Sequence, residues 1–314
     1  MAHEIKSLLI GYDGSSCAGE AIDDLRRAGL PAEGIEAIVL SVADVWPELP
    51  APDYSKLYPQ AAQRARQRAE EAIMEARTLA DQGLQRLARY FPNWKTRAEV
   101  ATDSPYWGLV KKAHEWRSDL LVVGSQGRSA PGRMLFGSVS QNAILYAGTS
   151  VRIGRCQADR TLEPDAPVRL LVGWDGSTDA ELAVAAATAR HWPQGSLGLI
   201  VTALDTRLAT ALPVVEPKTG TLVPGPVMED ERDRILSRAR AAAEGLRAGG
   251  LSVEEPILRD GDPKHVLLEE ADAWNCDCIF VGAKGRSRIE RVLLGSVSAA
   301  VAARARCSVE VIRG

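Results

Sequence analysis

Two aspartates, Asp13 and Asp175, are the first side chains in this sequence whose type and setting could do chemistry. Each lies in a Gly-x-Asp-Gly-Ser segment that follows a short apolar run, Leu8–Ile10 or Leu170–Val172. A carboxylate at the end of a buried strand can accept hydrogen bonds from ribose hydroxyls or from an adenine amino group. An aspartate before a helix is also common as a capping or turn residue. This segment alone therefore leaves a ligand contact and a turn role open.

Glycines and serines form a second repeated motif, with the pattern G-x2-G-x9-G-S. Its residues are Gly124, Gly127, Gly137, Ser138, Val139 and Ser140 in the first copy, and Gly282, Gly285, Gly295, Ser296, Val297 and Ser298 in the second. We expect the glycines to permit positive φ and close approach of a ligand to the main chain. Ser138 and Ser296 are predicted helix N-caps, whose hydroxyls and following N–H groups would form an anion site. Arg128 and Arg286 follow the second glycine of each copy and could add positive charge for a phosphate.

The sequence patterns that would indicate other kinds of site, such as a P-loop, a dinucleotide fingerprint or a metal site, are missing or incomplete. The sequence has no Gly-Lys-Ser or Gly-Lys-Thr, so it lacks a P-loop, and no G-x-G-x-x-G follows the first strand, which disfavours hydride transfer. Cys276 and Cys278 enter a predicted strand without a second ligand pair, so we interpret them as core residues rather than a metal or redox site. His265 has no nucleophile beside it in sequence and is interpreted as structural or solvated. We therefore predict neither a catalytic residue nor a metal ligand.

Both motifs recur at a nearly constant distance along the chain. Asp13 and Asp175 are 162 positions apart (175 − 13), and Gly124 and Gly282 are 158 apart (282 − 124). Solenoid repeats have periods of only about 20–50 residues, so this spacing indicates a tandem domain duplication. A polar, proline-containing linker lies around residues 157–167. We therefore predict one domain at residues 1–156 and a second at residues 167–314.

Strand-like apolar runs alternate with helical patterns in both copies. The predicted strands are 8–11, 37–43, 96–101, 120–124 and 150–154, then 169–173, 197–203, 251–258, 277–282 and 307–312. The predicted helices are 16–29, 60–90, 105–116 and 138–146, then 178–191, 228–249, 263–274 and 296–304. This alternation predicts an α/β fold of two tandem doubly wound domains, each with a parallel sheet covered on both faces. Ligands bind such sheets beyond the carboxyl ends of the strands, where the strand order reverses, and both motifs follow strands.

Composition narrows the class of protein. The 314 residues are 46% hydrophobic and 25% charged with a net charge of −3, which is typical of a globular protein rather than a disordered or membrane chain. The near-neutral charge gives no reason to expect nucleic acid or a membrane as a partner. The odd number of cysteines, five, disfavours a disulfide framework, and the N-terminus has no apolar stretch of signal-peptide length. We expect a cytoplasmic protein.

Taken together, the strand-one aspartate, the G-x2-G-x9-G-[ST] motif and the element order resemble the universal stress protein family in its tandem, ATP-binding form. The resemblance covers residues 5–156 and 167–313. It implies two five-stranded parallel sheets of the adenine-nucleotide alpha-hydrolase-like type. It also implies that Asp13 and Asp175 contact adenosine, that Val42 and Ala203 offer backbone to adenine, and that the glycine motifs line ribose and phosphates. The implied ligand is ATP, with ADP or AMP as alternatives and Mg²⁺ as an optional companion.

The second copy matches the family pattern better than the first. It has Gly261-Asp262-Pro263 before its third helix, where the first copy has Thr102-Asp103-Ser104-Pro105. Two equivalent sites and two unequally occupied sites both remain open on this basis.

Three functions remain open from sequence. The first is a nucleotide-binding regulator in a stress response with at most slow ATP hydrolysis, because no general base is evident. The second is an adenylating enzyme of the wider superfamily, whose Ser-Gly-Gly-x-Asp-Ser type loop is replaced here by Asp-Gly-Ser-Ser or Asp-Gly-Ser-Thr. The third is a scaffold without nucleotide. The last strands, 151–154 and 309–312, could pair in the antiparallel sense, so we expect the domains to pair within the chain and the chain to form a homodimer.

Overall fold

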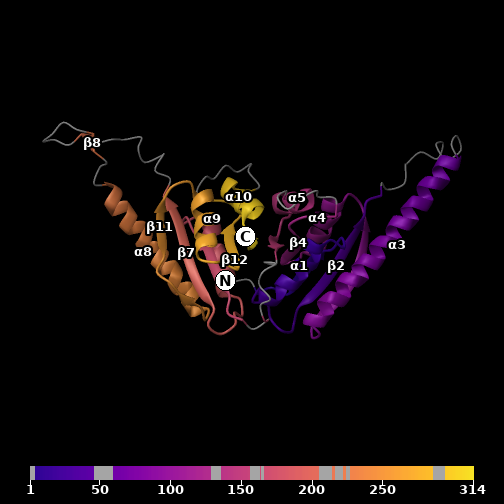
Figure 1. The fold of residues 1–314 in the computed structure, drawn as a ribbon, viewed down its shortest axis with the longest axis horizontal. Helices are drawn as coiled ribbons and strands as arrows, with labels where there is room; N and C mark the ends of the chain where they lie inside the picture. The colour runs from indigo at the N-terminus through magenta and orange to yellow at the C-terminus, as the bar shows by residue number, and fades with distance from the viewer. Residues whose placement is uncertain are drawn as a thin grey trace. The chain divides into compact units, whose positions relative to one another are not determined.

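The computed structural model describes residues 4–45, 59–128, 136–155, 163, 166–204, 214–215, 222–223, 227–285 and 294–314. They divide into two compact units (Figure 1). The first domain lies within Ile5–Arg160, and the second lies within Thr161–Gly314 and also includes Glu4. Each is a parallel α/β domain with the predicted alternation of strands and helices.

The first domain contains five parallel strands in the order β3-β2-β1-β4-β5. Its elements are β1 (Ser7–Gly11), α1 (Ser16–Asp24), the 3-10 turn η1 (Leu25–Arg27), β2 (Glu36–Ala43), α3 (Pro59–Tyr90), β3 (Lys95–Thr102), α4 (Pro105–Trp116), β4 (Leu120–Gly124), α5 (Ser138–Tyr146) and β5 (Ser150–Gly154). The chain runs outward from β1 through β2 to β3 and then returns to β4 on the other side. The order therefore reverses between β1 and β4, where the sequence places its two motifs.

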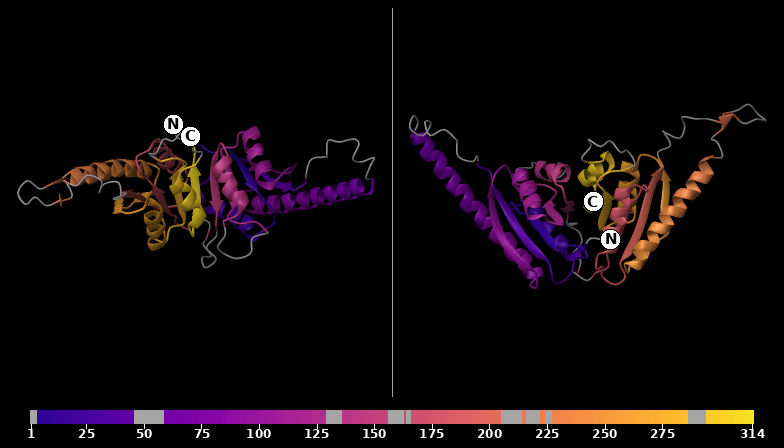
Figure 2. Two further views of the ribbon diagram at one scale, coloured as in Figure 1. Left: turned by 90° about the horizontal axis from the view of Figure 1, so that it is seen from above. Right: turned by 180° about the vertical axis from the view of Figure 1, so that it is seen from behind.

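Helices cover both faces of this sheet. Helices α1 and α3 contact each other on one face, and α4 and α5 contact each other on the opposite face. Helix α3 runs alongside β2 and β3 in the views of Figures 1 and 2. Because both faces are covered, β4 is buried at every residue, which explains its unbroken apolar sequence.

The second domain repeats the arrangement, with β7, β6, β12 and β13 side by side in that order and β10 and β11 both beside β7. Its elements are β6 (Arg169–Gly173), α6 (Thr178–Thr188), β7 (Leu197–Leu204), α8 (Val227–Ala248), β10 (Ser252–Val253), β11 (Ile257–Asp260), α9 (Pro263–Ala273), β12 (Cys278–Gly282), α10 (Ser296–Arg304) and β13 (Ser308–Ile312). A short antiparallel hairpin, β8 (Val214–Val215) and β9 (Leu222–Val223), lies in a segment predicted only as a loop.

The predicted strand 251–258 is wrong in one respect, because it is two strands. Both β10 and β11 pair with β7, but residues 254–256 stand opposite only residues 199 and 200, so the register shifts between the two strands. Proline has no backbone N–H to donate, and within sheets it is confined to edge strands, strand starts and bulges such as this one. The edge of the second sheet is broken where the first domain has the continuous eight-residue strand β3.

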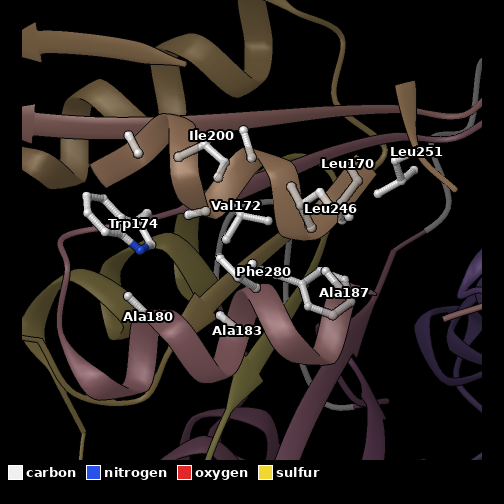
Figure 3. Close-up of a cluster of buried hydrophobic side chains, with 14 of the residues drawn as sticks. Leu170, Val172, Trp174, Ala180, Ala183, Ala187, Ile200, Leu246, Leu251 and Phe280 are labelled. Carbon is white, nitrogen blue, oxygen red and sulfur yellow. The ribbon is translucent and has the colours of Figure 1, made fainter. Parts of the chain in front are cut away.

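A cluster of apolar side chains fills the second domain between its sheet and the helices α6 and α8 (Figure 3). Val172 and Phe280 come from neighbouring strands, and the small residues Ala180, Ala183 and Ala187 come from one side of α6. Alanine at these positions lets the helix approach the sheet closely. Trp174 lies at one end of the cluster and is only 3% exposed, directly before the strand-one aspartate of this domain.

Candidate functional site

A cavity of about 580 Å³ opens at the carboxyl ends of β1, β2 and β4 in the first domain. Its volume lies within the roughly 300–1,000 Å³ range of small-molecule sites. Every residue that the sequence predicts for the first site lines this cavity: Asp13, Val42, Gly124, Gly127, Arg128, Gly137, Ser138, Val139 and Ser140. The fold thus brings together two motifs that are more than a hundred residues apart.

Asp13 connects the two motifs through its carboxylate. Oδ1 accepts hydrogen bonds from the backbone N–H of Ser15 (3.0 Å) and from its hydroxyl (2.6 Å), and Oδ2 accepts one from the backbone N–H of Arg128 (3.2 Å). Ser15 in turn is the N-cap of α1 and accepts a hydrogen bond from Ala18 N–H. The turn role left open by the sequence is therefore real, and Asp13 also holds the glycine loop beside it.

The motif glycines are required for close packing rather than for positive φ. The positive-φ glycines include Gly14 and Gly176 beside the aspartates, whereas the described glycines of G-x2-G-x9-G-S are not among them. A Cβ on Gly124 would lie 2.6 Å from the backbone carbonyl of Cys17, because α1 crosses β4 at this point. A Cβ on Gly127 would lie 2.9 Å from Oδ2 of Asp13. The expected backbone conformation is therefore wrong, and the absence of a side chain is what matters.

Helix α5 begins at the cavity, but with a different cap from the one predicted. The N-cap is Gly137, in an extended conformation, and Ser138 is the first helical residue. The first intrahelical bond runs from Gln141 N–H to the Gly137 carbonyl (2.9 Å). The N–H groups of Ser138, Val139 and Ser140 precede it and have no acceptor within the helix, so they remain available as donors to an anion.

The hydroxyl of Ser140 does not serve the cavity. It is buried and donates a hydrogen bond to the Gly124 carbonyl (2.6 Å), which ties α5 to the end of β4. Ser298 makes the same bond to Gly282 in the second domain (2.5 Å). These serines position the helix N-terminus, while Ser138 is exposed at its start.

Arg128 is paired with a residue that the sequence did not connect to it. Its Nη1 lies 2.5 Å from Oε1 of Glu75 on α3, and both side chains are about half exposed. The guanidinium is therefore held at the α3 side of the cavity. The corresponding Arg286 lies outside the described residues.

Helix α3 forms a wall of the cavity through Ala72, Glu75, Ala76 and Leu79. The sequence motifs predicted ligand contacts only at strand ends and glycine loops and gave no indication of this wall. The signal was present as small residues four apart, Ala72, Ala76 and Ala80, which give a helix a face that can lie close to a sheet.

The end of β2 supplies a less polar part of the cavity. Strands β1 and β2 pair up to Gly11 and Leu40, so Val42 extends past the end of β1. Val42 lies with Leu40, Pro105 and Leu109 in the lining. Ser41 turns its hydroxyl away to the Tyr12 carbonyl (2.6 Å). This part offers apolar surface and strand-end backbone for a flat ring.

The second domain has a much smaller cavity at the same place, about 90 Å³. Of the predicted residues, Asp175, Ala203, Gly282, Gly285, Val297 and Ser298 line it, whereas Gly295 and Ser296 do not. Gly295 is the N-cap of α10, so Ser296 is again the first helical residue instead of the predicted cap. Asp175 Oδ1 accepts a hydrogen bond from Ser177 N–H (2.9 Å), as Asp13 does from Ser15.

The cysteines of the second domain are packed in its interior. Cys276, Cys278 and Cys307 are each at most 3% exposed. Burial, reinforced by the neighbouring Cys307 thiol, raises the pKa of Cys276 well above its usual range. These residues are core thiols, as the sequence indicated for Cys276 and Cys278. Among the described helices, none is long and apolar enough to cross a membrane.

Comparisons with known proteins match both halves of the chain. The model of the universal stress protein family matches residues 4–153 and again 168–313. A universal stress protein of Mycobacterium tuberculosis is 28% identical over 98% of this chain and 96% of its own length. One from Thermus aquaticus is 30% identical over 46% of this chain and 97% of its own length, which is the length of one domain.

The solved structures agree in fold. A universal stress protein from Archaeoglobus fulgidus superposes with a TM-score of 0.60 at 19% identity, covering 98% of this chain and 96% of that one. At this identity the likeness concerns the fold. With two matches of the family model that together span nearly the whole sequence, the chain belongs to the universal stress protein family and is a tandem member of it.

Proposed function

We propose that the chain binds an adenine nucleotide, ATP in the first instance, in the cavity of the first domain. The observation that carries the proposal is the convergence in one cavity of a strand-end carboxylate, a glycine loop and the start of a helix. The apolar end at Val42 suits the adenine ring. The free N–H groups at the start of α5 suit the phosphates, because they carry the positive end of the helix dipole.

The donor set also fits the parts of a nucleotide between these ends. Asp13 is an acceptor for ribose hydroxyls beside the loop of Gly127. Arg128 lies at the α3 side of the cavity, where it is paired with Glu75. A rotation of its side chain would let Arg128 bind a phosphate, and Glu75 would then be available as a ligand for a cation such as Mg²⁺. Both movements need only side-chain rotation, since the two groups are about half exposed.

A regulator is favoured over an enzyme by the positions of the carboxylates in the lining. Asp13 accepts hydrogen bonds from Ser15, and Glu75 is paired with Arg128. Asp44 follows β2, at the end of the cavity that we assign to adenine rather than to the phosphates. General-base catalysis needs a group within reach of a water or hydroxyl at the phosphate, so we expect slow hydrolysis at most. The adenylating enzyme and the scaffold without nucleotide remain the competing functions.

The test is direct. Native mass spectrometry of freshly purified protein should show bound adenine nucleotide, and ATP, ADP or AMP at millimolar concentration should raise the melting temperature. Gly137→Asp should abolish both effects, because its carboxylate would lie at the anion end of α5. No stabilisation by any of the three nucleotides would contradict the proposal. Release of pyrophosphate rather than phosphate would indicate adenylation instead.

The proposal also covers the cellular location of the protein and its state of association. We infer a cytoplasmic address, which is supported by the free thiol of Cys17, as expected in a reducing compartment. We also propose that the two domains pair with each other within the chain, that the chain forms a homodimer, and that the protein acts in a stress response. Solution scattering and sedimentation would measure both, and a monomer with separated domains would contradict them.

A further inference from the structure

The two domains carry the same motifs but not the same cavity. The first cavity has about 580 Å³ and the second about 90 Å³. Ligand pockets for small molecules fall at about 300–1,000 Å³, so the second lies well below this range. The strand-one aspartate makes the same turn in both domains. In the second domain the glycine loop is also bonded to α6, because Lys284 N–H donates to Asp179 Oδ2 (2.9 Å).

A larger difference lies in the helix beside the strand-one motif, α3 in the first domain and α8 in the second. The two helices correspond with a shift of 159 positions, because their buried positions then coincide: Ala76, Ala80, Gly83 and Leu87 in α3, and Ile235, Ala239, Ala242 and Leu246 in α8. With this shift Leu79 corresponds to Arg238 (238 − 79 = 159). Two wall residues of the first cavity, Ala76 and Leu79, are thus replaced by the larger Ile235 and Arg238.

Contacts with the strand-one turn support this correspondence independently. A Cβ on Gly14 would meet Leu79 Cδ2 at 2.6 Å, and a Cβ on the equivalent Gly176 would meet Arg238 Nη2 at 3.0 Å. Leu79 and Arg238 therefore lie over the same turn in the two domains. Leu79 lines the first cavity, whereas no described residue of α8 lines the second.

Arg238 is exposed and makes two contacts beside the second site. Its guanidinium lies 5.3 Å from the centre of the Trp174 ring, and Nη2 donates a hydrogen bond to the Gly176 carbonyl (3.3 Å). Trp174 belongs to the same apolar cluster as Ile235. Its indole Nε1–H donates a hydrogen bond to Glu181 Oε1 (3.1 Å). Arg238 and Ile235 therefore stand at the positions where Leu79 and Ala76 line the first cavity.

We propose that Arg238 closes the second site, so that the chain holds one adenine nucleotide, in the first domain. This inference rests on the proposed function and deepens it by assigning the two sites different states. Arg238 acts by covering Trp174 and the turn at Gly176 rather than by touching a ligand. The duplication would then give one binding domain and one closed domain, instead of two equivalent binders.

The experiment counts nucleotides per chain by native mass spectrometry and calorimetry with ATP. The wild-type protein should bind one, and Gly137→Asp should bind none. Adding Arg238→Leu to Gly137→Asp should restore one bound nucleotide, now in the second domain. In the reverse direction, Leu79→Arg alone should weaken binding at the first site at least about tenfold. Arg240→Leu, on the same helix but paired with Glu255, is the matched control and should change neither count.

Each result decides between alternatives. Two nucleotides per wild-type chain, or one remaining on Gly137→Asp, would overturn the inference while leaving nucleotide binding itself intact. No nucleotide on the wild-type chain would instead overturn the proposed function. If Arg238→Leu restores nothing, or removes a nucleotide already bound, Arg238 is not the closing residue. Because Leu79→Arg does not depend on Gly137→Asp, the inference remains testable if the aspartate variant fails to fold.

Discussion

Gly124 and Gly148 are both glycines of the first domain with ordinary backbone conformation, but their surroundings differ completely. A Cβ on Gly124 would lie 2.6 Å from the backbone of Cys17, whereas nothing lies within 4 Å of a Cβ on Gly148. We expect Gly124→Ala to cost about 1–3 kcal/mol of unfolding free energy, because either α1 or β4 must move. Gly148→Ala should change it by no more than about 0.5 kcal/mol. Urea unfolding of the two variants measures the difference, and equal stabilities would contradict the packing argument.

The thiol of Cys276 gives a second prediction for single residues, one that depends on pH. Its pKa is raised in the folded state by burial and by Cys307, whereas an unfolded thiol has a pKa of about 8.5. The folded state therefore keeps a proton that the unfolded state loses, so this contribution to stability is complete below about pH 8.5 and declines above it. Unfolding free energies from pH 7 to 10 should fall, and Cys276→Ala should reduce the slope above pH 8.5. An unchanged slope would show that other groups cause the decline.

For single residues, the sequence predicted which residues would line the first site better than it predicted what each of them does there. The residues expected at the first site do line one cavity, because strand-end motifs converge wherever parallel strands share an edge. The assignment of Ser138 and Ser296 as caps was wrong, since an extended glycine can take the cap position without a side-chain bond. The pair of Arg128 and Glu75 could not be found from spacing, because it joins a loop to a helix 53 residues away.

Among the elements, α1 is fastened to β5 by a buried ion pair. Nε of Arg152 lies 2.7 Å from Oδ2 of Asp24, and the two side chains are 1% and 9% exposed. Removing one partner leaves the other charge buried, so Arg152→Ala should destabilise the first domain by about 3–5 kcal/mol. Arg240→Ala, which breaks an ion pair exposed by 59% and 64%, should cost about 1 kcal/mol or less. Thermal unfolding compares them, and similar losses would contradict the role given to burial.

The elements themselves were largely predictable, and the exceptions have physical causes. Apolar runs such as Leu120–Gly124 are unmistakable because parallel strands are covered on both sides. The break between β10 and β11 was missed because the strand-like segments 251–253 and 257–258 flank it on both sides, so that Glu254, Glu255 and Pro256 were included in one strand. The cavity wall on α3 was missed because a long helix with many charges satisfies the pattern of a solvated helix, although one narrow alanine face lies against the sheet.

For the whole molecule, the duplication means that each half provides a control for the other. Corresponding positions carry Leu79 and Arg238, and Ala76 and Ile235, beside the same strand-one and glycine motifs. The repeat in the sequence left equal and unequal sites both open, because the shared motifs do not show which residues form the cavity walls. Differences in wall residues decide whether a site is open, and only the packing of α3 and α8 on their sheets shows which residues form those walls.

Hydrogen exchange measured by mass spectrometry should show this asymmetry in the intact chain. With saturating ATP, amides near the start of α5 and in the loop of Gly124 and Gly127 should exchange more slowly, because a ligand on those N–H groups opposes local opening. Peptides that cover the start of α10 and the loop of Gly282 should exchange at nearly the same rate with and without ATP. In Gly137→Asp the protection at α5 should disappear. Equal protection in both domains would mean that Arg238 and Trp174 move aside for nucleotide, and that the smaller cavity is a resting state rather than a closed site.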